Sequence, residues 1–177
     1  MKKPHISIII VAVLVIGWLL TSRNGQGPAE NINAPSGQDI RLEKAPNFSL
    51  KDYSGETVNF ADFAGKPLVI NSWAAWCPFC RQELPDFAAA QKEFGNQVVI
   101  IAIDRQESLA VAKGFTDEQG TTDELIFLLD PKDSFYKSIG GFSMPETIFV
   151  NKDGNIADHK RGPMDFNEIR QKIQKIL

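Results

Sequence analysis

The stretch that decides the fold is N71-S-W-A-A-W-C-P-F-C-R-Q-E-L-P85. Residues 67–73 before the cysteines form a short apolar run that suits a buried strand. Residues 78–94 after them are rich in helix formers, with Pro85 predicting a kink and Gly95 predicting the end of the helix. The two cysteines of the chain, Cys77 and Cys80, are therefore expected where a strand passes into a helix.

This spacing gives the cysteine pair its chemistry. Cys77 begins the predicted helix and Cys80 lies in its first turn, so both sulfur atoms lie on one side, within bonding distance. The unpaired N–H groups and the positive end of the helix dipole favour a thiolate at Cys77, which we expect to be the nucleophile, with a lowered pKa. Pro78 suits the first helical position, where no N–H donor is needed. Cys80, one turn further in, should be less exposed and should resolve the mixed disulfide that Cys77 forms with a partner.

Other uses of a C-x-x-C pair fit this chain less well. A zinc site needs a second pair of ligands, which the sequence does not offer, so we expect no metal. Covalent haem attachment needs a histidine after the second cysteine, where this chain has Arg81, and a peroxidase needs a hydroxyl where it has Ala74. A purely structural disulfide stays open, although so small a ring removes little chain entropy. We expect no cofactor beyond a redox-active Cys77–Cys80 disulfide.

Strand and helix patterns alternate along the rest of the chain. Residues 45–59 read as a β-hairpin with its turn at Ser54-Gly55, and Asp133 and Asp165 are candidate helix caps. Further strands are expected at residues 97–103, 126–129, 146–150 and 155–161, and helices at 108–119, 133–138 and from 166 onward, with a single helical turn at 61–63. This order predicts an α/β sheet covered by helices on both faces, with an antiparallel hairpin at one edge.

Residues 1–22 predict an N-terminal transmembrane signal anchor. Lys2 and Lys3 precede an apolar run at residues 6–20, which is about 22 Å long as a helix, against about 30 Å of hydrocarbon. No small-residue cleavage site follows, which favours an uncleaved anchor over a cleaved signal peptide or a buried helix. The positive-inside rule then places the rest of the chain outside the cytoplasm, where disulfides persist. Residues 23–44, rich in Gly, Pro, Asn and Ser, predict a flexible linker, with an ordered extension as the alternative.

Composition limits the remaining classes. A chain of 177 residues with 43% hydrophobic and 23% charged residues suits one globular domain, which we place at residues 45–177 and expect to be monomeric. A formal net charge of −3 gives no sign of a nucleic-acid partner. Two cysteines are too few for a disulfide-rich scaffold.

At these motifs the chain resembles the thioredoxin superfamily, and within it the membrane-tethered thiol–disulfide oxidoreductases of the TlpA, ResA and DsbE (CcmG) group. The resemblance runs from A45-P-N-F-S-L through the cysteine stretch and V98-V-I-I-A-I-D to M144-P-E-T-I-F-V-N-K-D-G. It implies a thioredoxin-like α/β fold, to which this group adds the N-terminal β-hairpin and a central helix–strand insertion at residues 108–129.

The resemblance also implies roles at matching positions. Pro145 takes the place of the family's cis-proline, which leaves the backbone of Met144 to pair with an extended substrate. Glu83 matches an acidic residue beside the active site that would exchange a proton with Cys80, unless it is a solvated glutamate of the helix face. Glu146 matches the acidic residue of a P-E-T motif and would help to bind substrate, unless it is a surface charge at a strand edge.

Three further residues near the cysteines carry expectations. Trp76 would form an apolar rim for the partner, whereas Trp73 suits the core. Arg81 is either solvated or favours the thiolate. Plain thioredoxins carry a buried aspartate where this chain has Asn71, so the proton role falls more heavily on Glu83.

The resemblance favours a reductant that acts in the periplasm or at the outer face of the cell membrane. Cys77 would attack a disulfide in an exported protein, for example the haem-binding pair of apocytochrome c, and a membrane electron donor would reduce the Cys77–Cys80 pair again. Pro78 and Phe79 do not fix the potential, so an oxidant that introduces disulfides stays open. A non-enzymatic binding or chaperone module is the third possibility. With no third cysteine, donor and acceptor must be separate proteins.

Overall fold

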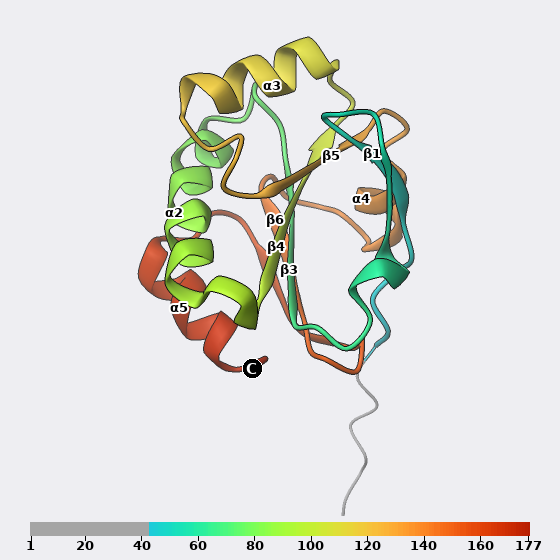
Figure 1. Ribbon diagram of the computed structural model, residues 1–177, viewed down its shortest axis with the longest axis vertical. Helices are drawn as coiled ribbons and strands as arrows, with labels where there is room; N and C mark the ends of the chain where they lie inside the picture. Colours follow the sequence, from blue (N-terminus) through green and yellow to red (C-terminus); the bar gives the residue numbers. More distant parts are fainter. Residues whose placement is uncertain (1–42) are drawn as a thin grey trace, which may run out of the picture. The chain divides into compact units, whose positions relative to one another are not determined.

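The computed structural model describes residues 43–177, which form one sheet with helices on both faces (Figure 1). Along the chain the elements are β1 (Ser49–Asp52), β2 (Thr57–Asn59), η1 (Phe60–Phe63), β3 (Leu68–Trp73), α2 (Pro78–Phe94), η2 (Gly95–Gln97), β4 (Val99–Arg105), α3 (Leu109–Glu118), β5 (Ile126–Asp130), α4 (Ser134–Ser138), β6 (Glu146–Val150), β7 (Ile156–Arg161) and α5 (Phe166–Gln174). The predicted alternation of strands and helices is confirmed.

The sheet has the strand order β2-β1-β5-β4-β3-β6-β7. Its central strands β5, β4 and β3 are parallel, while β6 is antiparallel to β3 and β1 is antiparallel to β5. Antiparallel hairpins therefore lie at both edges, β6–β7 at one and β1–β2 at the other. The sequence predicted both hairpins but placed only one of them at an edge.

Alternate residues of the central strands pack against different layers. On one face, Leu68 and Ile70 belong to a cluster with Phe135 of α4. On the other face, Val69 packs with apolar side chains of α2 and α5. Figure 1 shows α2 and α5 together on one side of the sheet and α4 on the other. Each fully buried aliphatic or aromatic side chain stabilises the fold by about 1.5–3 kcal/mol, which makes these two layers the main source of stability.

The register of the strands brings three loops together at one end of the sheet, where β3 and β4 finish and β6 begins. Trp73, the last residue of β3, pairs with Asp104 near the end of β4, and Ser72 pairs with Glu146 at the start of β6. The loops that follow β3 and β4 and the loop that precedes β6 therefore meet at this end of the sheet. Cys77 ends the first of these loops, and Cys80 lies in the first turn of α2 that follows it.

Two of the helices begin as the sequence predicts. Helix α2 has Cys77 as its N-cap and Pro78 at its first position, ends at Gly95 with a positive φ of 55°, and runs through Pro85. Helix α5 is capped by Asp165, whose carboxylate accepts the Glu168 N–H at 2.8 Å.

The predicted cap of α4 is wrong. Asp133 precedes this helix, but its backbone is left-handed and its side chain makes no cap hydrogen bond. Its carboxylate instead binds the Arg105 guanidinium, with an Nε–Oδ1 distance of 2.6 Å. The buried Asp130, at the end of β5, accepts the Phe135 N–H at 2.7 Å and the Ser134 hydroxyl at 2.9 Å. The carboxylate three residues further from the helix thus satisfies its first turn.

Two predictions fall outside the described residues. The anchor at residues 1–22 and nearly all of the linker at residues 23–44 precede Glu43, where the described part of the chain begins. Among the helices of residues 43–177, none is long and apolar enough to cross a membrane.

The Asp130 cap predicts a stability effect. Asp130→Ala leaves the buried Phe135 N–H without its acceptor, so the free energy of unfolding in urea should fall by about 2 kcal/mol. Asp123→Ala removes an exposed aspartate and should change it by less than about 0.5 kcal/mol. An Asp130→Ala protein as stable as the Asp123→Ala control would contradict the assignment of the cap.

Candidate active site

Cys77 and Cys80 are joined by a disulfide at the start of α2, and their Cα atoms are 5.3 Å apart. The Cys80 N–H donates to Cys77 Sγ at 3.2 Å, so Cys77 is the N-cap through its own sulfur atom. This places Cys77 Sγ where backbone N–H groups and the helix dipole stabilise a negative charge. The predicted position of the pair is confirmed.

Both cysteines are buried in this oxidised form, with exposed fractions of 2% for Cys77 and 1% for Cys80. The expected difference in exposure is therefore absent. They share an apolar cluster with Trp73, which is fully buried as predicted, and with Phe115 of α3. The Arg81 guanidinium lies 4.9 Å from the centre of the Phe115 ring.

Large apolar side chains beside the cysteines are exposed. Trp76 is 61% exposed and Phe79 is 54% exposed, although each is adjacent in sequence to a buried cysteine. The predicted rim at Trp76 thus has a second member in Phe79. Phe142, in the loop before β6, is 86% exposed. Residue type does not show which side chains are exposed, so the place of Phe79 and Phe142 at this surface was not predicted.

The loop before β6 carries a cis peptide bond between Met144 and Pro145, as the resemblance implies. Met144 is partly buried and packs against the cluster that contains both cysteines. Within residues 43–177, no hydrogen bond reaches the backbone N–H or C=O of Met144. Its backbone is therefore open to a partner segment.

Glu146 fixes this loop through hydrogen bonds to its backbone. Its side chain is fully buried, and Oε2 accepts the N–H groups of Phe142 at 2.8 Å and Ser143 at 2.9 Å. Oε1 lies 3.1 Å from Arg161 Nε and 2.6 Å from His159 Nε2. Burial raises the pKa of the Glu146 carboxyl, but the two N–H donors and His159 outweigh it and leave the pKa below its usual value. The surface-charge interpretation is wrong, and a direct contact with substrate stays a prediction.

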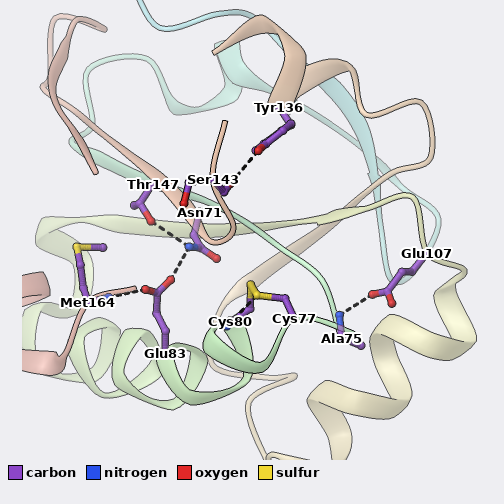
Figure 2. Close-up of a disulfide and its surroundings, with 10 residues drawn as sticks. All are labelled: Asn71, Ala75, Cys77, Cys80, Glu83, Glu107, Tyr136, Ser143, Thr147 and Met164. Carbon is purple, nitrogen blue, oxygen red and sulfur yellow. Dashed lines mark hydrogen bonds between the residues drawn. A yellow bond between two sulfur atoms is a disulfide. The ribbon is translucent and has the colours of Figure 1, made fainter. Parts of the chain in front are cut away.

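Tyr136 of α4 holds the same loop from another element. Its hydroxyl donates to the Ser143 carbonyl at 2.8 Å (Figure 2). A Cβ atom at Gly141 would collide with the Tyr136 ring, which explains a glycine at this point of the loop.

Glu83 lies buried between α2 and the sheet, with an exposed fraction of 1%. Oε1 accepts from Asn71 Nδ2 and Oε2 accepts from the Met164 N–H, both at 2.8 Å (Figure 2). Burial raises the pKa of Glu83 to about 8 despite these two hydrogen bonds. The solvated-glutamate interpretation is wrong, and Glu83 can hold a proton near neutral pH within one helical turn of Cys80.

Asn71 connects Glu83 to the sheet. Its amide also donates to Thr147 Oγ1 at 2.9 Å, and its buried Oδ1 has no hydrogen-bond partner among the described residues. The sequence analysis missed Thr147 and the Met164 backbone. Both are far from Glu83 along the chain, so no local pattern could have revealed them.

A second acidic group, which follows β4, binds the loop of residues 74–77 between β3 and α2, called the redox loop below. Glu107 Oε2 accepts the Ala75 N–H at 2.6 Å, and the Glu107 N–H donates to Asp104 Oδ1 at 3.1 Å. Figure 2 shows the disulfide between Glu83 on one side and Glu107 on the other. The role of Asp104 and Glu107 was not predicted. The available signal was two acidic residues just after the apolar run at residues 97–103.

Residues 43–177 contain no group of three or more His, Cys, Asp or Glu side chains that could hold a metal ion. The chemistry that the site can perform with its own residues is thiol–disulfide exchange. Cys77 would be the attacking sulfur, Cys80 the resolving sulfur and Glu83 a proton-holding group beside them.

Comparisons with known proteins agree with this chemistry. The Redoxin family matches residues 42–173. The thioredoxin-like protein YneN of Bacillus subtilis (strain 168) is 30% identical over 178 residues, which cover 98% of each chain. The thiol-disulfide oxidoreductase ResA of the same organism is 30% identical over 121 residues, 68% of this chain and 66% of its own.

A solved structure shows the same fold. The thiol:disulfide interchange protein DsbE from Chlorobium tepidum superposes with a TM-score of 0.70 at 24% identity, covering 76% of this chain and 96% of its own. The predicted thioredoxin-like fold, with its N-terminal hairpin and inserted α3–β5 unit, is therefore confirmed. The chain belongs to the Redoxin family and is a thiol–disulfide oxidoreductase of the ResA and DsbE type.

Proposed function

We propose that the protein is a reductant of exported proteins. Its Cys77–Cys80 dithiol would reduce disulfides such as the haem-binding cysteine pair of apocytochrome c. Similarity to proteins named ResA and DsbE supports this substrate class.

The observation that carries the direction of electron flow is a buried disulfide with carboxyl groups around it. Glu83 and Asp104 are buried and Glu107 is partly buried; Glu83 lies on one side of the pair, and Glu107 binds the backbone of the loop before Cys77. Burial disfavours a thiolate, and a charge on any of these carboxyl groups would disfavour it further, so both effects favour the disulfide over a reduced pair with an ionised sulfur atom. The N-terminus of α2 acts in the opposite sense, but on Cys77 alone. Strong oxidants of this fold owe their high potential to a stabilised reduced form, so these carboxyl groups support a low potential.

The reaction balances with the residues present. The Cys77 thiolate attacks a substrate disulfide, forms a mixed disulfide and releases one substrate thiolate, which takes a proton from water. Cys80 then loses its proton to the Glu83 carboxylate and attacks Cys77 Sγ, which releases the second substrate sulfur as a thiolate that takes this proton from Glu83. The substrate gains two electrons and two protons, and the enzyme is left with its Cys77–Cys80 disulfide.

The surface beside the disulfide suits an extended polypeptide. The open backbone of Met144 offers one N–H and one C=O, as an added strand requires. Trp76 and Phe142, in loops, and Phe79, in the first turn of α2, present apolar surface beside it. A substrate cysteine between apolar residues, in a segment that is not yet folded, would fit this surface.

The remaining proposals concern place and partners. We infer an uncleaved anchor at residues 1–22, a monomeric catalytic domain outside the cytoplasm, and no nucleic-acid partner. Since the chain has two cysteines, electrons must arrive from a separate donor, which we place in the membrane.

The role of Glu83 predicts a slow resolving step when its carboxyl is lost. Glu83→Gln should slow the attack of Cys80 on the mixed disulfide by about a hundredfold. In the wild type this rate should rise with pH and level off above about pH 8, because the base is the Glu83 carboxylate. Rapid-mixing kinetics with a model disulfide measures both effects. Glu118→Gln, an exposed glutamate of α3, is the control, and a Glu83→Gln profile equal to it would contradict the role.

The direction of electron flow predicts a low reduction potential. Equilibration of Cys77–Cys80 with a dithiol buffer should give about −270 mV or lower, in the range of thioredoxin. A value near about −120 mV would overturn the reductant and favour the oxidant that introduces disulfides.

The substrate class predicts a trapped intermediate. Cys80→Ala cannot resolve the mixed disulfide, so in its native host Cys77 should hold exported proteins in a bond that reducing agent releases. Cys77→Ala is the matched control and should hold none. If Cys80→Ala captures nothing and the wild type does not reduce insulin, the non-enzymatic binding module takes the place of the reductant.

A further inference from the structure

Asp104 and Glu107 form a carboxyl pair that the proposed reaction does not use. Asp104 pairs with Trp73 in the register of β4 and β3, at the point where β3 passes into the redox loop, and it is fully buried. Asp104 Oδ1 accepts the Glu107 N–H, while Oδ2 is buried without a hydrogen-bond partner in the described part of the chain. Glu107 in turn accepts the Ala75 N–H, two residues before Cys77, at 2.6 Å.

Neither Asp104 nor Glu107 forms an ion pair with a Lys, Arg or His of residues 43–177. Arg105, which lies between them in sequence, pairs with Asp133 instead. The titratable group from the hairpin is Tyr53, whose phenol pKa is raised by burial and further by Asp104, Asp117 and Glu107. Burial and then the neighbouring Glu107 raise the pKa of Asp104 to about 8. Glu107 is partly buried, but an ionised Asp104 beside it would be a fully buried charge without a cation, so the pair keeps one proton near neutral pH.

We propose that Asp104 and Glu107 are a positioning pair for the redox loop, in which the Glu107 carboxylate holds the Ala75 N–H and Asp104 carries the proton that the pair keeps. The inference rests on the proposed function for its purpose, because a fixed loop keeps Cys77 Sγ at the N-terminus of α2. Asp104 is assigned the proton because it is fully buried and its Oδ2 has no hydrogen-bond partner among the described residues, whereas Glu107 is only partly buried.

This arrangement has a definite pH dependence. Below about pH 8 the pair carries one negative charge, and above it Asp104 ionises and adds a second charge behind the loop. The second charge disfavours the Cys77 thiolate. The reactivity of Cys77 should therefore rise less steeply with pH than that of a thiol without such a neighbour.

Hydrogen exchange of the Ala75 amide, followed by NMR in the full chain, tests the position. Glu107→Ala removes the acceptor, so exchange should become at least about tenfold faster. Glu107→Gln keeps a side-chain oxygen that can accept the same N–H, so exchange should stay within about threefold of the wild type. Glu118→Gln again controls for the loss of one negative charge. Exchange at the wild-type rate in Glu107→Ala overturns the positioning role.

Alkylation of Cys77 by iodoacetamide in the reduced protein tests the proton. Asp104→Asn exchanges a neutral acid for a neutral amide at low pH, so below about pH 7 its rate should equal that of the wild type. Above about pH 8 the variant lacks the second charge and should react about two- to fourfold faster. A structural defect alone would change the rate at every pH, and curves that stay parallel throughout overturn the part given to Asp104.

Both readouts work without a substrate. Their outcome is therefore independent of the reduction-potential and insulin assays that test the proposed reductant function. Should Glu107→Ala not fold, the chemical shift of the Ala75 amide replaces its exchange rate. That shift should titrate near about pH 8 in the wild type and not in Asp104→Asn, and its failure to titrate overturns the proposal.

Discussion

The antiparallel pairing of β3 with β6 is the constraint on which the site depends. Asn71 lies opposite Thr147 and Ser72 lies opposite Glu146, so neighbouring rows of one register serve the two faces of the sheet. Asn71 and Thr147 face α2, where the Asn71 amide binds both Thr147 and Glu83. Glu146 faces the other layer and binds the loop that ends in Pro145. If the register slipped by one residue, Thr147 would no longer face α2 beside Asn71, and Glu146 would no longer face the loop before β6. The position of Glu83 and that of the loop before β6 therefore both depend on this one strand register.

Buried acidic groups beside the disulfide cost the fold stability. Glu83 and Asp104 are both held away from water with raised pKa values, which a fold selected for stability alone would avoid. Asn71 makes the burial of Glu83 tolerable because an amide donates a hydrogen bond without adding charge. An aspartate at this position would put a second carboxyl next to Glu83 and raise the cost further.

Local patterns in the sequence were enough for the helices, the strands and the redox pair. The bounds of α2, the cap of α5 and the place of Cys77 follow from residue type and spacing within one or two helical turns. Pro145 and the α3–β5 insertion came from a resemblance in the motifs around them. Contacts between distant segments were beyond reach, such as the Met164 N–H on Glu83 and the Ala75 N–H on Glu107. The Asp133 cap failed for the same reason, since Arg105 of β4 binds that carboxylate.

In the loop before β6, backbone groups on both sides of Met144 form hydrogen bonds with other segments of the chain. Glu146 accepts hydrogen bonds from the N–H groups of Phe142 and Ser143. The Tyr136 hydroxyl donates to the Ser143 carbonyl, and the Gly162 N–H donates to the Pro145 carbonyl. The Met144 backbone makes no hydrogen bond within residues 43–177, and its side chain packs against the cysteine cluster. A partner that pairs with Met144 would therefore gain hydrogen bonds without breaking any. Its side chains must then lie against exposed aromatic rings, which favours segments with apolar residues beside their cysteines. Selectivity of this kind would come from the fixed geometry of the loop rather than from a charged contact.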